Sequence, residues 1–388
     1  MSTETTETTK AQRSANTMEF TVSKSDLVRE LSLSQGVVEK KTTIPILSNI
    51  LIEAQGDRIN LTATDLELGI RCSCPAKVKK EGAGTIPARK LLDYVRLLPD
   101  ADIEVKLLEN HWANLTCGRS KTRIAGMSRE SFPELPEMPD VLAEIPIKLL
   151  ASMIGKTIFS ISSEESRFTL NGALLILKSN GITMVATDGH RLAMVEQLID
   201  FPEMTSSYRA LLPRKAMGEI LKLAQESGDD AKIQFSGDDN HLFFRAGDRL
   251  LLSRKLTGNF PDFERVLPKD QPSSIQLSRE ELRGAIERVS QFADERSRAI
   301  RFRVLSGEVK IHSSLSETGE SEESIPADYE GNSVEIGFNA QYMLDFLRAV
   351  PEGTVEFHFR DPQSAGELRP HQQEETYKYR YVVMPMRI

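Results

Sequence analysis

An internal repeat constrains the fold of this chain more than any other feature of its sequence. The tripeptide Ala-Thr-Asp at residues 63–65 returns at residues 186–188, and Phe-Pro-Glu at residues 132–134 returns as Phe-Pro-Asp at residues 260–262. The segments follow each other in the same order and at almost the same spacing. We therefore expect one structural unit to be used at least twice.

A third copy is visible in the way each unit begins. Residues 20–27, 145–150 and 275–282 each place a short apolar strand before a helix start. Ser23 and Ser278 stand where a side chain can cap the first turn of such a helix. The three starts are almost evenly spaced, so the chain is predicted to contain three units of similar length.

Segments rich in proline at residues 132–140 and 266–274 support cuts between these units. The predicted domains are residues 18–140, 141–270 and 271–388. The preceding residues 1–17 are rich in Thr, Ser and Glu and cannot bury enough apolar surface to order themselves, so we expect a disordered tail.

Each unit is expected to combine short strands with two helices. The strands alternate apolar and polar residues over residues 48–61, 172–185 and 300–312, a pattern typical of antiparallel sheets covered on one face. The predicted fold class is therefore α+β. The apolar positions of the second helices recur at helical spacing: Leu91, Val95 and Leu98; Met217, Ile220, Leu221 and Ala224; Met343, Phe346, Leu347 and Val350.

The opposite faces of these helices carry positive charge. Their basic residues are Arg89, Lys90, Arg96, Lys215, Lys222 and Arg348. Any one of these faces could simply be solvated, but recurrence in three copies favours a function. The net charge of −8 argues against nucleic-acid binding when taken alone, although it does not show where the charges lie.

The segment Met184–Val195 is expected to form a tight hairpin. Asp188-Gly189 lies between two apolar runs, and glycine accepts the positive φ of a primed turn. His190 and Arg191 follow only in the middle copy, so they need an explanation other than the turn. Asp188 and His190 could form an acid–base pair, yet the first copy keeps Asp65 without a histidine, which favours a turn-capping aspartate.

No sequence motif indicates catalysis or a cofactor. Gly155-Lys156-Thr157 lacks the first glycine of a phosphate-binding loop, and the glycines at residues 82–84 do not fit a dinucleotide fingerprint. Cys72, Cys74 and Cys117 do not have the spacing of a zinc site or a disulfide framework. We expect no enzyme activity, no cofactor and no metal, and a reducing cytoplasm fits the cysteines.

Two further residue clusters suggest interactions with other chains. Around the hairpin, Arg167 and Leu170 on one side and Pro261, Arg265 and Val266 on the other suit a peptide-binding groove with an apolar floor and a polar rim. A second cluster pairs charges at the two ends of the chain. The basic strand carries Arg119, Lys121 and Arg123, and the acidic run carries Glu317, Glu320, Glu322 and Glu323. Such ends suit a head-to-tail association that closes into a ring.

Several motifs together resemble the bacterial DNA polymerase III β sliding clamps. They are ATDGHRLA at residues 186–193, PARK at 87–90, FPDFERVLP at 260–268 and YVVMPMRI at 381–388. The resemblance begins near Met18 and extends to the last residue. It implies a homodimeric ring of six similar domains, with helices lining a central hole and antiparallel sheets outside.

The resemblance also implies functional residues. A partner-peptide pocket would comprise Arg167, Leu170, Thr187, Gly189, His190, Arg191, Leu192, Pro261, Arg265, Val266, Val382, Met384, Pro385, Met386 and Arg387. Residues facing DNA would be Lys41, Arg89, Lys90, Arg214 and Lys215. The dimer interface would contain Arg119, Lys121, Phe292, Glu320, Glu322 and Glu323.

The implied function is that of a processivity factor. The ring would encircle duplex DNA without sequence preference and would tether the replicative polymerase, the clamp loader and repair proteins through short peptides. It would not contact a membrane, and it would work in the cytoplasm at the nucleoid. Two alternatives are a monomeric repeat scaffold that binds proteins without enclosing DNA, and a hydrolase that uses Asp188 and His190.

Overall fold

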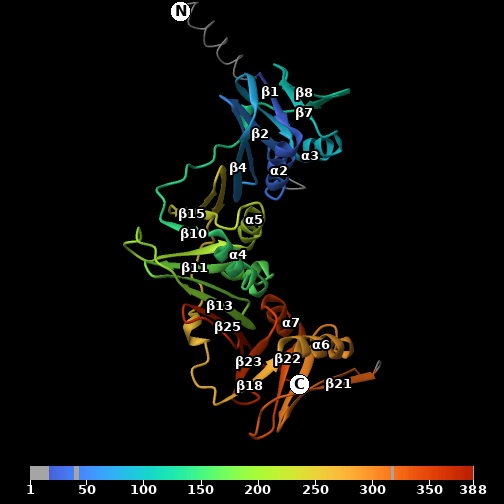
Figure 1. Ribbon diagram of the computed structural model, residues 1–388, viewed down its shortest axis with the longest axis vertical. Helices are drawn as coiled ribbons and strands as arrows, with labels where there is room; N and C mark the ends of the chain where they lie inside the picture. The colour runs from blue at the N-terminus through green and yellow to red at the C-terminus, as the bar shows by residue number, and fades with distance from the viewer. Residues whose placement is uncertain (1–16, 39–42, 316–318, 388) are drawn as a thin grey trace, which may run out of the picture. The chain divides into compact units, whose positions relative to one another are not determined.

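The computed structural model describes residues 17–38, 43–315 and 319–387, and it shows the predicted three copies of one arrangement (Figure 1). Each copy runs strand, helix, three strands, strand, helix and three strands, and the first copy inserts one more strand, β5. The predicted tail at residues 1–17, apart from Thr17, and the candidate residue Lys41 lie outside the described residues.

The bounds of the elements follow the copies. The first copy contains β1 (Met18–Ser23), α2 (Lys24–Ser34), η1 (Pro45–Ser48), β2 (Asn49–Gln55), β3 (Arg58–Thr64), β4 (Leu68–Pro75), β5 (Lys77–Lys80), β6 (Gly82–Pro87), α3 (Ala88–Leu97), β7 (Asp102–Leu107), β8 (Trp112–Cys117), β9 (Ser120–Ala125) and η2 (Arg129–Ser131). The second contains β10 (Ala143–Pro146), α4 (Ile147–Gly155), η3 (Ile158–Ser160), η4 (Glu165–Leu170), β11 (Gly172–Lys178), β12 (Gly181–Thr187), β13 (Arg191–Leu198), β14 (Tyr208–Pro213), α5 (Arg214–Gln225), β15 (Lys232–Gly237), β16 (His241–Ala246), β17 (Arg249–Arg254) and η5 (Phe263–Arg265). The third contains β18 (Ser273–Ser278), α6 (Arg279–Val289), η6 (Ser290–Phe292), β19 (Ala299–Leu305), β20 (Glu308–Leu315), β21 (Gly319–Pro326), β22 (Val334–Asn339), α7 (Ala340–Ala349), β23 (Thr354–Phe359), β24 (Gly366–Pro370) and β25 (Tyr377–Val383).

The strands form four antiparallel sheets in two compact units. The first unit, residues 1–148 and 215–255, holds a five-stranded sheet in the order β5-β1-β7-β8-β9 and an eight-stranded sheet in the order β10-β15-β16-β17-β4-β3-β2-β6. The second unit, residues 149–214 and 256–388, holds an eight-stranded sheet in the order β14-β11-β12-β13-β25-β24-β23-β18 and a four-stranded sheet in the order β21-β20-β19-β22. The α+β prediction is confirmed.

Each eight-stranded sheet is continuous across two copies of the repeat. In the first unit β17 of the second copy pairs with β4 of the first, with Leu251 opposite Ile70. In the second unit β25 of the third copy pairs with β13 of the second, with Tyr381 opposite Ala193. β9 of the first copy is the equivalent of β17 and β25, and β21 of the third copy is the equivalent of β4 and β13. Neither pairs with another copy, and each lies at the edge of its sheet within the described residues.

The helices cover the sheets with their apolar faces. Helices α2 and α3 lie side by side in the first unit, as α6 and α7 do in the second (Figure 1). The predicted caps are confirmed, because the Oγ atoms of Ser23 and Ser278 accept hydrogen bonds from the first turns of α2 and α6. The predicted stripe of α5 needs one correction: Leu221 is only half-buried, whereas Leu223 is buried.

The basic residues on the other faces are exposed, as expected for Arg89, Lys90, Arg96, Lys215, Lys222 and Arg348. Among the described residues no helix is both long and apolar enough to cross a membrane.

Candidate protein-binding site

The hairpin between β12 and β13 forms as predicted, but its turn is longer than the predicted two-residue type. Thr187 pairs with Leu192, so four residues separate the last pair of the ladder. Gly189 takes the left-handed conformation with φ of 89°. The Asp188 Oδ1 atom accepts hydrogen bonds from the backbone N–H groups of His190 at 2.9 Å and Arg191 at 3.1 Å. The aspartate side chain therefore caps this wider turn.

The first copy builds the same turn without the histidine. The Asp65 Oδ1 atom accepts from the N–H groups of Glu67 and Leu68, and the Thr64 hydroxyl takes the role of the Thr187 hydroxyl. Leu66 occupies the position of Gly189 with φ of 77°, a strained conformation for a side chain with a Cβ atom. The repetition shows that Asp188 has a structural role in the turn, as the sequence comparison predicts.

An apolar pocket of about 160 Å³ lies beside this turn in the second unit. Its lining comes from the turn and β13, from the segment around η5, and from the end of β25. The lining residues are Leu170, Thr187, Gly189, Arg191, Leu192, Pro261, Phe263, Val266, Val382 and Met384. All but Phe263 were candidates from the sequence, and the structure brings together residues from η4 to the chain end.

Phe263 is the lining residue that the sequence analysis missed. It is 8% exposed and packs in one cluster with Leu192 and Val382. The signal was present in the sequence, because Phe263 follows Pro261 by two residues inside the FPDFERVLP segment.

The remaining candidates border the pocket. The Arg167 Nη1 atom donates to the Asp188 carbonyl at 3.0 Å, and the Arg167 Nε atom pairs with Glu164 at 2.9 Å. The His190 carbonyl accepts a hydrogen bond from the Met384 N–H at 2.9 Å. The imidazole ring of His190 stacks on the Tyr342 ring, with centroids 6.5 Å apart. These contacts fix the rim and attach the end of β25 to the turn.

Three further candidates belong to the chain end, and one is the last residue of η5. Met386 donates its N–H to the Gly337 carbonyl at 2.8 Å, which holds the segment with Pro385 and Arg387 in place. Arg265 is 85% exposed and pairs with Asp262 at 2.8 Å. None of these four side chains lines the apolar pocket.

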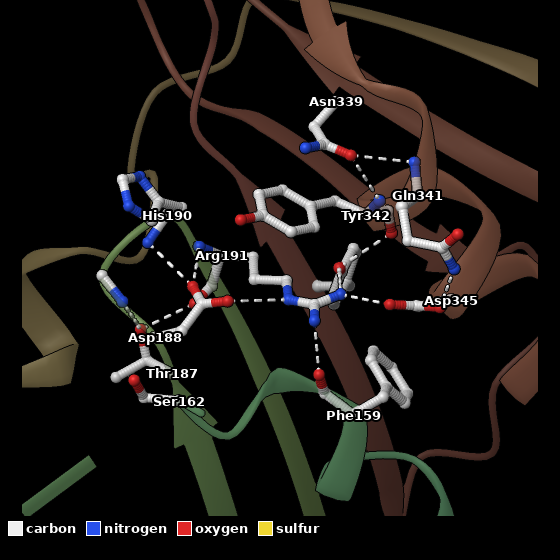
Figure 2. Close-up of polar contacts among 12 residues, drawn as sticks. Phe159, Ser162, Thr187, Asp188, His190, Arg191, Asn339, Gln341, Tyr342 and Asp345 are labelled. Atoms are coloured by element: carbon white, nitrogen blue, oxygen red, sulfur yellow. Dashed lines mark hydrogen bonds and ion pairs between the residues drawn. The ribbon is translucent and has the colours of Figure 1, made fainter. Parts of the chain in front are cut away.

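Arg191 lies in the pocket lining and also makes contacts that the sequence did not predict. It lines the pocket, but its side chain is only 9% exposed and its guanidinium points towards Asp345 and the Phe159 carbonyl (Figure 2). It pairs with Asp188 at 3.1 Å and Asp345 at 2.5 Å, donates to the Phe159 carbonyl, and lies 4.3 Å from the centre of the Tyr342 ring. Arg191 thus ties β13 and η3 of the second copy to α7 of the third.

The charge of Arg191 is secured by its neighbours. Burial lowers the pKa of the guanidinium, but Tyr381, Asp345 and Asp188 together raise that pKa above its ordinary value. The buried tyrosine hydroxyl of Tyr381 also donates to the Tyr342 carbonyl at 2.8 Å. Arg191 is therefore a permanent cation held between two carboxylates.

The candidate DNA-facing residues begin two helices. Arg89 and Lys90 lie in the first turn of α3, and Arg214 and Lys215 begin α5; all four are exposed. Lys215 forms an ion pair with Asp65 of the capped turn in the first copy.

The candidate dimer residues lie on or beside the two sheet edges. Arg119 and Lys121 are exposed at the β8–β9 turn and on β9. Glu320, Glu322 and Glu323 lie on β21 and pair within the chain with His312, Lys310 and Arg288. Phe292 in η6 is half-buried, and its ring lies close to Gly319 at the start of β21.

Comparison with known proteins gives one consistent result. Family models described as the N-terminal, central and C-terminal domains of DNA polymerase III beta subunit match residues 18–136, 144–262 and 264–387. The chain is 33% identical over 373 residues to the beta sliding clamp of Chlamydia muridarum, covering 96% of this chain and 99% of that one. It is 34% identical over 374 residues to the beta sliding clamp of Pseudomonas putida, covering 96% and 100%.

Solved structures agree. A crystal structure of the sliding clamp from Pseudomonas aeruginosa superimposes with a TM-score of 0.88 at 32% identity, covering 96% of this chain and 100% of that chain. A second crystal structure from that organism, with griselimycin bound, gives a TM-score of 0.89 at 33% identity with the same coverage.

Proposed function

The chain belongs to the bacterial DNA polymerase III beta subunit family, the beta sliding clamps, and we propose that it serves as a DNA polymerase processivity factor in the form of a closed ring of two copies. The ring encircles duplex DNA and slides along it. The apolar pocket beside the capped turn tethers the replicative polymerase, the clamp loader and repair proteins through short peptides.

The two open sheet edges carry this proposal. Each junction between copies of the repeat pairs the last strand of one copy with a strand of the copy before it. That partner is the third of the three strands that follow the first helix, namely β4 for β17 and β13 for β25. β9 is the last strand of the first copy, and β21 is the equivalent of β4 and β13 in the third copy. Neither strand pairs with another copy of the repeat within the described residues. An unpaired edge exposes a row of N–H and C=O groups that favours strand addition. Pairing β9 of one chain with β21 of another repeats the internal junction and closes a head-to-tail dimer.

The charges of these edges are complementary. Lys121 and Arg123 are exposed on β9, whereas β21 presents Glu320 and Glu322. The glutamates already have weak intrachain partners at 3.6 Å, so an approaching basic strand meets an acidic surface that is only partly neutralised. This charge complementarity favours the pairing of β21 with β9 over the pairing of two acidic β21 edges.

DNA retention by such a ring does not require tight binding. The chain carries a net charge of −8, and exposed lysines and arginines are present at the starts of α3 and α5. Sequence-independent contacts to phosphates from residues such as Arg89 and Lys90 hold the duplex loosely, which permits sliding. The proposed clamp domains are residues 18–140, 141–270 and 271–388, and no catalytic step is assigned to any of them. Because the proposed track is chromosomal DNA, we place the protein at the nucleoid in the cytoplasm.

The dimer is tested by two complementary charge reversals. In one variant Arg119→Glu and Lys121→Glu place two acids at the start of the β9 edge, and in the other Glu320→Lys and Glu322→Lys make β21 basic. Each variant alone juxtaposes like charges at both interfaces and should shift towards monomer, whereas a mixture of the two restores opposite charges at both. Light scattering at low salt, where exposed charges are least screened, measures the mass.

A matched control reverses two lysines at the other edge of the same sheet. Lys77→Glu with Lys80→Glu on β5 gives the same change in charge and should leave the dimer intact. A wild-type chain that is monomeric at micromolar concentration would favour the repeat scaffold. Variants that dimerise alone as well as together would remove the edge assignment.

Topological retention is tested directly on DNA. The wild-type protein is loaded onto nicked circular DNA by the clamp loader of its own organism, and bound and free protein are separated by gel filtration. We expect the protein to remain with the circle at high salt and to leave when a restriction enzyme linearises it. Equal loss from circular and linear DNA would show binding by affinity and not by enclosure.

A further inference from the structure

A second hollow lies next to the apolar pocket in the same unit. It measures about 510 Å³ and is lined by residues 265–271 on one side and by Arg360, Ser364 and Ala365 on the other. Val266 lines both this hollow and the apolar pocket, so the two lie side by side. We call the second hollow the trough.

The walls of the trough are fixed by hydrogen bonds to the backbone. The Gln271 Nε2 atom donates to the Ala365 carbonyl at 2.7 Å, and the Arg380 Nη2 atom donates to the Pro268 carbonyl at 3.0 Å. Arg380 is itself held by Glu367, which is fully buried, through contacts of 2.6 and 2.9 Å. The segment after η5 is therefore a rigid wall, and a ligand that binds there meets a preformed surface.

The trough is positively charged although the chain as a whole is acidic. Its lining contains Arg265, Lys269 and Arg360 against one acid, Asp270. Arg360 lies 3.9 Å from Asp270, a weak pair, and Lys269 has no ion pair within 4 Å among the described residues. Lys269 thus presents positive charge without an acidic partner within 4 Å among the described residues, whereas Arg360 is partly neutralised by Asp270.

The charge is specific to this junction. The equivalent segment of the first copy has Glu137 where the second has Arg265, and there Arg71 binds Glu137 at 2.9 Å. The repeat alone therefore does not produce a cationic trough. The basic residue at position 265 occurs in the second copy, the same copy in which His190 and Arg191 follow the turn.

We propose that the trough binds an acidic flank of the same partner peptide whose apolar residues fill the pocket. This inference rests on the proposed function of the pocket and adds a charge preference to it. The peptide runs across Val266, so that an aspartate or glutamate next to its apolar core meets Lys269 and Arg360. Partners with acidic flanks are then favoured over partners with neutral or basic flanks.

The test uses fluorescein-labelled synthetic peptides and fluorescence anisotropy with the full chain. One peptide has a Leu-Phe core between serines, two others replace the serines before or after the core by aspartates, and a fourth carries lysines on both sides. One of the two acidic peptides should bind about three- to fivefold more tightly than the serine peptide at low salt, and the gain should shrink as salt is added. Lys269→Ser combined with Arg360→Ser should remove the gain and leave the affinity for the serine peptide unchanged.

Two controls separate the trough from the pocket. Lys178→Ser removes a cation at the far end of β11, about 20 Å along the strand from Gly172, and should keep the gain. His190→Ala with removal of residues 384–388 should abolish binding of every peptide. An acidic gain that survives in the Lys269/Arg360 variant, or no gain at all with the serine peptide still bound, overturns the trough alone. Failure of all peptides to bind the wild-type chain overturns the pocket and the trough together.

Discussion

Replacing Arg191 by methionine should lower the free energy of unfolding by about 3 kcal/mol, because it leaves Asp345 and Asp188 as largely buried carboxylates without their cation. Both side chains are less than one-fifth exposed, at 17% and 14%. Gln341 still donates to Asp345 at 2.6 Å, and the turn N–H groups still donate to Asp188, but neither supplies a positive charge. Differential scanning calorimetry should show the melting temperature falling by roughly 10 °C.

A double variant distinguishes the lost charge pair from lost packing. Arg191→Met with Asp345→Leu removes both partners, and it should recover part of the stability that the single variant loses. The control is Arg301→Met, which breaks an exposed pair with Glu335 and should change stability by no more than about 1 kcal/mol. An Arg191 variant as stable as the Arg301 variant would show that the buried network does not hold the second and third copies together.

The architecture was predictable from the sequence because each copy of the repeat is marked by features that depend on residues close together in the chain. Serine caps, alternating strands and the amphipathic stripe of α7 depend on neighbouring residues, and these features agree with the structure. The capping role of Asp188 was predictable for the same reason, since Asp65 offered an internal comparison without His190.

The details that the sequence did not predict depend on contacts between distant segments. The turn after β12 has four residues because Asp188 caps two successive N–H groups, which a dipeptide signal cannot show. The ion pair of Arg191 with Asp345 and its hydrogen bond to the Phe159 carbonyl were not predicted, because both partners lie far away in the sequence. Leu223 is buried in place of Leu221 because the packing partners of α5 decide which side of the stripe is covered.

The first unit contains a second buried ion pair, which no sequence signal announced. Glu30 on α2 is 1% exposed, and both of its carboxylate oxygens accept from Arg249 on β17, at 2.8 and 2.9 Å. Burial raises the pKa of Glu30, but the hydrogen bonds from Arg249 and Arg29 outweigh it and hold that pKa below its ordinary value. Burial, and next to it the negative charge of Glu30, raise the pKa of the Cys74 thiol to about 12.

Replacing Arg249 by methionine should therefore reverse the pH dependence that Glu30 confers. In the wild-type chain the lowered pKa makes Glu30 stabilising above its unfolded-state pKa of about 4.3, and this contribution is lost only as the pH falls further. Without Arg249, Arg29 still pairs with Glu30 at 2.8 Å, but burial is the largest influence on this carboxyl. We therefore expect the pKa of Glu30 to rise above the unfolded value, so that stability is lost as the pH rises. The variant should be less stable than wild type by about 3 kcal/mol at pH 7, and the deficit should shrink towards pH 5, by at most about 1.4 kcal/mol per pH unit.

Urea unfolding at pH 5, 6 and 7 measures this deficit, and two further variants identify its origin. Arg254→Met removes an arginine from the other end of β17, where it pairs with Glu67 in an exposed contact, and it should show a small deficit that does not change with pH. Combining Arg249→Met with Glu30→Gln removes the ionisable carboxyl and should abolish the pH dependence of the deficit. Because Arg249 joins the second copy of the repeat to the first, a deficit that stays constant from pH 5 to 7 would mean that this junction is held by strand pairing and apolar packing, with no contribution from the buried charge.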